Sequence, residues 1–135
     1  MQIPKRSKQD VENCPVFIAS NILGKRWTLL ILQTLMTHEA AEGLRFGQIQ
    51  SHLDWVSPKV LTQRLRELEH EMIITREVDA SSIPAKVSYS LTNKGQDLRG
   101  IIQLMQNWGR KYGGDATAGC LGEDLEHCQS CPEDA

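Results

Sequence analysis

Apolar residues recur along most of this chain with helical spacing. After a polar segment at 1–12, the stretch "PVFIASNIL" is mostly apolar and stops at Gly24. Pro15 suits the first position of a helix because the N–H that proline lacks would have no partner there, which makes Cys14 the N-cap. The pattern therefore predicts a loose arm over 1–12 and a helix from Pro15 to Gly24.

The next two segments predict the centre of the core. The segment 25–36 is nearly apolar along its middle, and the expected inner face consists of Trp27, Leu30, Ile31 and Leu35, with Leu29 and Leu32 beside it. A polar loop follows at 37–43. Residues 44–53 then predict a short extended start and a helix whose Ile49 and Leu53 face inward.

The segment 57–73 predicts a helix with two different faces. Ser57 is placed to cap it, and Pro58 takes the first position. An apolar stripe is formed by Leu61, Leu65, Leu68 and Met72. The opposite face carries Lys59, Thr62, Gln63 and Arg66, with Arg64 on its flank. Taken alone, this polar face fits an ordinary solvated surface as well as a binding surface.

The remaining pattern predicts a hairpin and a closing helix. Segments 73–78 and 86–92 are strand-like, because Val87, Tyr89 and Leu91 alternate with polar residues, and the loop 79–85 joins them. A helix from about Asn93 to Gly113 has an apolar stripe made of Leu98, Ile101, Ile102, Met105 and Trp108. We therefore expect a mainly α-helical fold with a β-hairpin (α+β), arranged as a winged helix-turn-helix. The DNA major groove admits one α-helix, whose outward polar side chains can reach base edges.

Linked motifs in matching order strengthen this interpretation. The segments "CPVFIASNILGKRWTLLILQTL", "LRFGQIQSHL", "VSPKVLTQRLRELEHEMIITRE", "VSYSLTNKGQDL" and "NWG" span about residues 13–112. Together they resemble the HxlR-type, MarR-like family of winged-helix transcriptional regulators. The resemblance implies a DNA-binding homodimer in which helix 58–72 enters the major groove, hairpin 73–92 is the wing and the terminal helices pair two subunits.

The resemblance also implies roles for individual residues. The expected base-reading residues are Ser57, Lys59, Thr62, Gln63 and Arg66. Contacts to phosphates are expected from Arg45, Arg64, Arg76 and Lys86, which supply affinity without sequence information. The wing loop has few basic residues, so we rank its contribution below that of the helix.

The closing helix gives a physical reason for a dimer. Its stripe, from Leu98 to Trp108, exceeds what a core already filled by the other helices needs. A second copy of the chain would cover it, and two-fold symmetry then predicts an inverted-repeat operator. The alternative is that this helix packs only against its own domain.

Cys14 has two interpretations. As an N-cap it would lie at the positive end of a helix, which favours the thiolate and its reactivity. In the resembled family a cysteine before Pro-Val is a signature, and in several members it senses electrophiles, disulfide stress or peroxide. The other interpretation is an inert cysteine that comes with the fold.

The charges divide the chain into a basic body and an acidic tail. Residues 1–114 hold all 15 Lys and Arg and 11 of the 17 Asp and Glu, whereas residues 115–135 hold the other six acids. The tail also carries four soft metal ligands, Cys120, His127, Cys128 and Cys131. A zinc site, a thiol–disulfide switch and an unstructured acidic tail all fit this segment. Outside the tail, no cofactor is expected.

Other classes of function fit less well. The histidines are scattered, and neither a phosphate-binding loop nor a catalytic triad can be assembled from local spacing. We therefore expect a regulator rather than an enzyme, located in the cytoplasm. The alternatives are a winged-helix module that binds a protein partner and a metal-responsive regulator that uses the tail.

Overall fold

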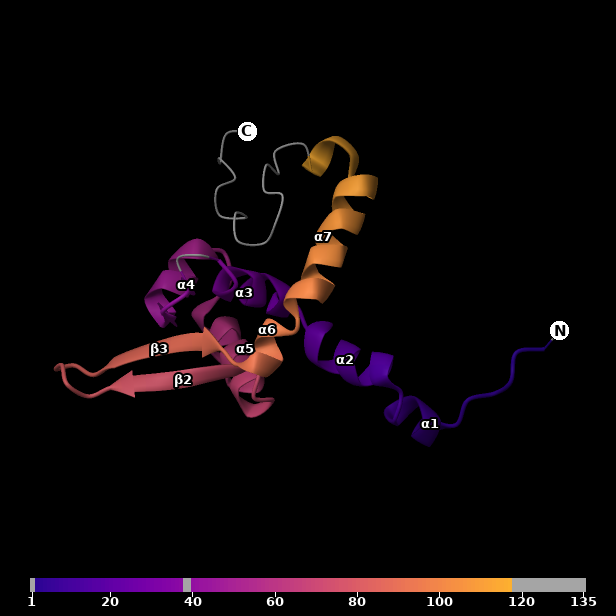
Figure 1. The fold of residues 1–135 in the computed structure, drawn as a ribbon, viewed down its shortest axis with the longest axis horizontal. Coiled ribbons are helices and arrows are strands. Elements are labelled where there is room, and N and C mark those ends of the chain that lie inside the picture. The colour runs from indigo at the N-terminus through magenta and orange to yellow at the C-terminus, as the bar shows by residue number, and fades with distance from the viewer. Residues whose placement is uncertain (1, 38–39, 118–135) are drawn as a thin grey trace.

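The computed structural model describes residues 2–37 and 40–117. Helices α3 to α6 form a body around the core, the hairpin β2–β3 extends from one side, and α1, α2 and α7 leave on the other (Figure 1). The winged helix-turn-helix predicted from the sequence is thus confirmed in its order of elements. Within the described residues, no helix combines the length and hydropathy needed to cross a membrane.

The first two helices differ in how well the sequence predicts them. Helix α2 (Pro15–Leu23) begins and ends as expected, with Cys14 at the N-cap and Gly24 at the C-cap. The expected arm over 1–12 is not irregular throughout, because α1 occupies Lys8–Glu12. Ser7 accepts a hydrogen bond from the Asp10 N–H at 3.0 Å, and the Asp10 carboxylate accepts one from the Ser7 N–H. This capping box stabilises a helical turn that has no buried face.

Helix α3 (Thr28–Leu35) begins later than predicted. Trp27 is its N-cap and has a left-handed backbone (φ 72°), so Lys25 and Arg26 lie in the preceding loop. The predicted inner face is also partly wrong. Leu30 is exposed, whereas Leu32 and Ile31 are fully buried. Because the segment is apolar on nearly every side, its periodicity alone could not define the buried face.

Helices α4 (Phe46–His52) and α5 (Pro58–His70) form the helix-turn-helix. Ile49 and Leu53 are buried, as predicted. The Ser57 hydroxyl accepts a hydrogen bond from the Val60 N–H at 3.2 Å, which confirms Ser57 as the cap of α5. The buried side of α5 consists of Leu61, Leu65 and Leu68.

Met72 was wrongly predicted to continue this buried stripe. The Ile73 N–H donates to the Leu68 carbonyl and the Met72 N–H donates to the Glu69 carbonyl. These two bonds form a Schellman motif, with Met72 in the left-handed conformation (φ 59°). Met72 is therefore turned out to solvent, and Ile73 takes the place in the core.

The wing belongs to a three-stranded antiparallel sheet with the order β1-β3-β2. Strand β2 (Ile74–Asp79) pairs with β3 (Lys86–Leu91), and the register places Arg76 opposite Tyr89 and Asp79 opposite Lys86. The short β1 (Leu44–Arg45) pairs with the other edge of β3. This third strand fixes the base of the wing to the start of α4.

The closing helix is interrupted. Helix α6 (Asn93–Gln96) and helix α7 (Arg99–Tyr112) replace the continuous helix predicted from Asn93, and the short 3-10 helix η2 (Gly114–Thr117) follows. Ile102 is buried in the core of its own domain and Leu98 packs against that core. Both were predicted to lie in a dimer interface. The rest of the apolar stripe points away from the body.

Gly95 is required by a close approach of two segments. A Cβ atom at this buried position in α6 would collide with the carbonyl oxygen of Ile73. We expect Gly95→Ala to lower the free energy of unfolding by about 1–3 kcal/mol, the range found for overpacked cores. Gly47→Ala in α4 is the matched control, because a Cβ there meets no atom within 4 Å; it should be neutral or stabilising by up to about 1 kcal/mol. Urea denaturation of both variants measures the difference.

Candidate nucleic-acid interface

Four of the predicted base-reading residues line one concave surface. Lys59, Thr62, Gln63 and Arg66 lie along the outward side of α5 and form this surface with Pro58 and Glu67. Their spacing by three or four residues places them on one helix face. We call this surface the reading face. Ser57 lies at its amino-terminal end, where its hydroxyl already caps the helix.

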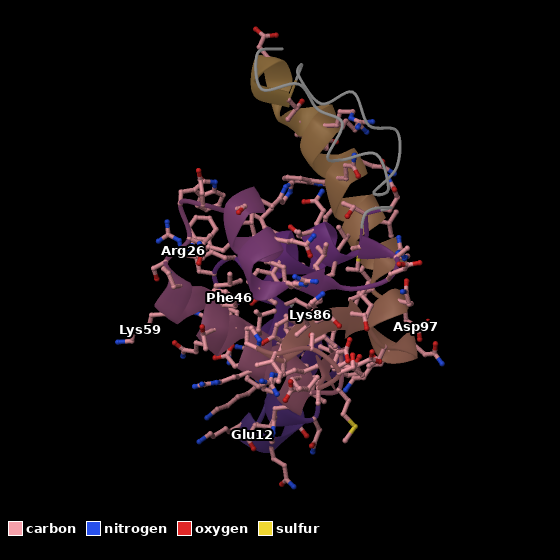
Figure 2. The ribbon with its side chains drawn as sticks, turned by 90° about the vertical axis from the view of Figure 1, so that its left-hand side faces the viewer. Glu12, Arg26, Phe46, Lys59, Lys86 and Asp97 are labelled. Atoms are coloured by element: carbon pink, nitrogen blue, oxygen red, sulfur yellow. The ribbon has the colours of Figure 1, made fainter. Side chains whose placement is uncertain are left out.

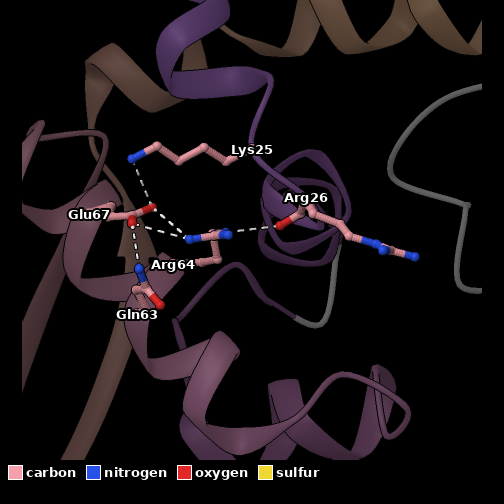
Figure 3. Close-up of polar contacts among 5 residues, drawn as sticks. All are labelled: Lys25, Arg26, Gln63, Arg64 and Glu67. Atoms are coloured by element: carbon pink, nitrogen blue, oxygen red, sulfur yellow. Dashed lines mark hydrogen bonds and ion pairs between the residues drawn. The ribbon is translucent and has the colours of Figure 1, made fainter.

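Arg64 does not act as the free phosphate contact that the sequence predicted. Its Nε donates to the Arg26 carbonyl at 3.0 Å, and its Nη1 pairs with the Glu67 carboxylate at 3.1 Å. Glu67 also pairs with Lys25 at 3.3 Å and accepts a hydrogen bond from Gln63 (Figure 3). Only 16% of the Arg64 side chain is exposed. Arg64 therefore joins α5 to the loop before α3.

The other residues predicted to contact phosphates are exposed, but they differ in how much positive charge they offer. Arg45 lies where β1 meets α4, and Arg76 lies on β2. Lys86 stands opposite Asp79 in the wing. Hydrogen bonds from Ser81 lower the pKa of the Asp79 carboxyl, with a smaller contribution from Lys86. Because Asp79 stays ionised, it offsets the positive charge of Lys86. Glu77 likewise offsets Arg76, so the wing carries no net charge.

An aromatic cluster beside the reading face was not predicted from the sequence. The Arg26 guanidinium lies 4.5 Å from the ring centre of Trp27, and Trp27 meets Trp55 edge to face at 4.6 Å. Trp55, in the turn between α4 and α5, is 57% exposed. Arg26 and Lys59 extend outward from the same side of the molecule (Figure 2). In the sequence, Lys25, Arg26 and Trp27 stand side by side, but this pattern also fits the start of a helix.

Cys14 is half-buried and has no disulfide partner among the described residues. The N–H of Phe17, followed by Arg6 and the N–H of Val16, favours the thiolate and lowers the pKa of the thiol. The expected N-cap environment is therefore present, and Arg6 from the segment before α1 adds a positive charge to it.

The helix-turn-helix and its wing agree with the comparison with known proteins. Residues 22–117 match the model of the HxlR-like helix-turn-helix family. The chain belongs to the HxlR-like family. Its relatives are transcriptional regulators, which are not enzymes.

Three relatives show how close the HxlR-like similarity is. The Bacillus subtilis HTH-type regulator YdeP, itself uncharacterized, is 37% identical over 106 residues, covering 78% of this chain and 79% of YdeP. Reduced YodB from B. subtilis has 38% identity and a TM-score of 0.62, covering 75% and 95% of the two chains. YodB has also been solved after diamide treatment and with bound quinone. The oxidized redox regulator HypR has 32% identity and a TM-score of 0.65, covering 73% and 96%.

An apolar face of α7 remains uncovered in this HxlR-like chain. It consists of Ile101, Leu104, Met105, Trp108 and Tyr112, all exposed. Trp108 and Tyr112 stack with ring centres 5.3 Å apart. Helix α2 also carries exposed apolar residues, Val16 and Ile18, which follow Cys14 closely in the sequence. Contiguous apolar surface of this kind marks an interaction site in a globular protein.

The predicted metal ligands lie outside the described residues. Cys120, His127, Cys128 and Cys131 all follow residue 117. Within residues 2–37 and 40–117, no three His, Cys, Asp or Glu side chains are placed to hold a metal ion. The zinc hypothesis stays a prediction, and zinc analysis of the full chain beside a chain ending at Thr117 tests it.

Proposed function

We propose that this HxlR-like regulator is a homodimer that binds an inverted-repeat operator through α5 and releases or repositions it when Cys14 is modified. The observation that supports operator reading most strongly is the reading face, where Lys59, Thr62, Gln63 and Arg66 share one exposed concave surface. Arg and Gln form bidentate hydrogen bonds with guanine and adenine edges, and the thymine methyl can pack against Thr.

The proposed operator contacts divide into two kinds. The reading face supplies direct readout in the major groove. Arg45, Arg76 and Arg26 supply phosphate contacts around it, with a smaller contribution from Lys86 because of Asp79. Trp55 widens the contact surface at the turn before α5. Arg64 acts indirectly, since it holds α5 against the loop that carries Arg26.

A salt series tests DNA binding. The DNA is the region upstream of the protein's own gene, and binding is followed by fluorescence anisotropy. Three or four phosphate contacts in each subunit predict a slope of log K against log salt of roughly −5 to −7. A slope near zero, or equal affinity for a scrambled fragment, would contradict the proposal.

Exposed apolar residues on two helices support the homodimer. Helices α2 and α7 both project from the side opposite the wing (Figure 1). Pairing two copies there covers Leu104, Met105 and Trp108 and leaves both reading faces free. The proposed dimer surface excludes Leu98 and Ile102, because their own core already holds them.

Thiol control is supported by the surroundings of Cys14 and by the redox states of relatives. Cys14 directly precedes α2, so a group added to its sulfur would lie next to the proposed dimer surface. YodB with bound quinone and HypR in oxidized form are structures of relatives with which this chain shares more than 30% identity. We infer that electrophiles modify Cys14 as a thiolate and thereby change the spacing of the two α5 helices.

Replacing Cys14 should abolish the response. Wild type, Cys14→Ser and a variant with Ser at Cys120, Cys128 and Cys131 are treated with a benzoquinone before the DNA-binding assay. We expect wild type and the tail variant to lose operator affinity, and Cys14→Ser to keep it. Equal loss in all three proteins would remove Cys14 from the mechanism.

The lowered pKa predicts a shifted pH profile. Alkylation by iodoacetamide follows the thiolate fraction, so its rate reaches half-maximum at the pKa of the thiol. In wild type this point should lie at lower pH than for an ordinary cysteine. Arg6→Ala should move it upward, because a positive charge that favours the thiolate is removed. Lys5→Ala is the matched control and should leave the profile in place.

A further inference from the structure

A large open cavity lies behind the reading face, in the described part of the chain. Its volume is about 670 Å³, within the usual range for small-molecule sites. It opens between α2, the start of α3 and the second half of α5. Ile22 and Leu68 provide apolar walls, and Lys25, Thr28 and Arg66 provide polar groups.

Thr28 lines this cavity and has an unusual buried hydroxyl. The residue is only 2% exposed, yet its Oγ1 has no hydrogen-bond partner in the part of the chain that the structure describes. A buried hydroxyl without a partner is costly, and such groups often mark the place of an absent ligand or water. By contrast, the buried Thr34 on the same helix donates its hydroxyl to the Leu30 carbonyl at 2.8 Å.

The cavity is lined by two cations, Lys25 and Arg66, and two carboxylates, Glu67 and Glu71, and they differ in their partners. Glu67 is already paired with Lys25 and Arg64. The Glu71 carbonyl accepts a hydrogen bond from Lys94 at 2.7 Å, so a positive charge also lies beside Glu71. Arg66 lines the cavity but forms no ion pair or hydrogen bond with the other described residues. The unpaired cation thus lies beside an apolar wall and an unsatisfied hydroxyl.

We propose that this cavity binds a small amphipathic carboxylate that acts as an effector. Its carboxylate accepts hydrogen bonds from Thr28 Oγ1 and Arg66, with Lys25 nearby, and its apolar body packs against Ile22 and Leu68. Glu71, the C-cap of α5, follows Arg66 by a rise of roughly 7.5 Å along the helix axis, which keeps the head group at the Arg66 end.

Arg66 provides the link to DNA. The same side chain lines both the cavity and the reading face. One guanidinium cannot hold a ligand carboxylate and a base edge at the same time in full bidentate geometry. Ligand binding therefore withdraws Arg66 from the DNA. This coupling rests on the proposed DNA-binding function, whereas binding of the ligand does not.

The first test is calorimetric titration of the full chain with 4-phenylbutyrate and octanoate, and with their neutral amides. We expect saturable binding of at least one acid and about tenfold weaker binding of its amide, the effect of a charge-assisted hydrogen bond. Thr28→Val keeps the shape of the side chain and removes only the hydroxyl. It should weaken binding of the acid about tenfold. The matched control Thr34→Val should bind like wild type.

Three further measurements complete the test. Circular dichroism verifies that Thr28→Val is folded. Lys25→Gln tests the role of positive charge, because it should weaken binding of the acid more than binding of the amide. In DNA-binding assays the acid should lower the operator affinity of wild type and Thr34→Val, and Thr28→Val should need about tenfold more acid for the same effect. Without ligand, Thr28→Val should bind DNA normally.

Several results would overturn the inference. The proposal fails if neither acid binds at millimolar concentration, or if acid and amide bind equally well. It also fails if Thr28→Val and Lys25→Gln both bind the acid as tightly as wild type. Binding of the acid without any effect on DNA would reject the link through Arg66. If the chain binds the acid but no specific DNA, the cavity proposal stands and the proposed function fails, so the two failures are distinguishable.

Discussion

Arg66→Ala should lose most of its preference for the operator over other DNA. A bidentate contact to a base contributes about 1–3 kcal/mol of discrimination. A symmetric dimer uses the residue twice, so we expect a loss of about 2–6 kcal/mol, at least about thirtyfold in operator affinity. Non-specific binding, which depends on total phosphate contacts, should fall only severalfold. Competition with unrelated DNA separates the two effects.

Lys8→Ala is the charge-matched control for Arg66→Ala. Lys8 is highly exposed on α1 and forms a long surface pair with Glu12 at 3.9 Å. The Lys8→Ala substitution removes one positive charge and leaves the reading face unchanged. Equal loss of specificity in the two variants would show that overall charge, rather than the position of Arg66, determines operator preference.

Trp108→Glu should convert the protein to a monomer. The side chain is 67% exposed in the single chain and lies at the centre of the apolar α7 face. In a dimer, the substitution would bury an unpaired carboxylate and remove an aromatic anchor, each costing about 2 kcal/mol or more. We expect the dimer dissociation constant to rise at least about a hundredfold, with operator affinity falling in parallel.

Sedimentation velocity measures this change, and the chain offers a matched control. Ile83 is fully exposed in the wing loop, away from α7. Ile83→Glu introduces the same charge on an exposed apolar residue and should leave the oligomeric state unchanged. The proposal would be contradicted if wild type sediments as a monomer, or if Trp108→Glu remains a dimer.

The parts of the fold that depend on local signals were predictable from the sequence. Pro15 and Pro58 both lie at the first position of a helix, and Cys14 and Ser57 precede them as N-caps. The spacing of Leu61, Leu65 and Leu68 fixed the buried side of α5, and therefore its outward side. Lys59, Thr62, Gln63 and Arg66 lie on that outward side.

The errors arose where tertiary contacts override local pattern. Met72 has the right spacing to be buried, but the Schellman motif ends α5 first. Leu98 and Ile102 belong to an apolar stripe, yet one domain uses part of the stripe and leaves the rest uncovered. Arg64 is basic and close to the reading face, but Glu67 and the Arg26 carbonyl hold it. Periodicity shows which residues share a face, while the partner of that face depends on the whole fold.

The cavity behind α5 could not be predicted for the same reason. In the sequence, Thr28 is one polar residue in an apolar helix. Only the three-dimensional packing shows that its hydroxyl has no hydrogen-bond partner among the described residues. Arg26 and Trp55 lie nearly thirty residues apart in sequence and approach each other through Trp27. Such clusters depend on how separate elements meet.

The most direct test of the central claim, that paired α5 helices read DNA sequence, is selection of bound sites from random DNA by the purified full chain. The account predicts an enriched inverted repeat whose half-sites are centred about 10 base pairs apart, or a multiple of that spacing. It also predicts that Arg66→Ala relaxes the same position in both halves. An unenriched pool, or an identical motif selected by Arg66→Ala, would contradict it.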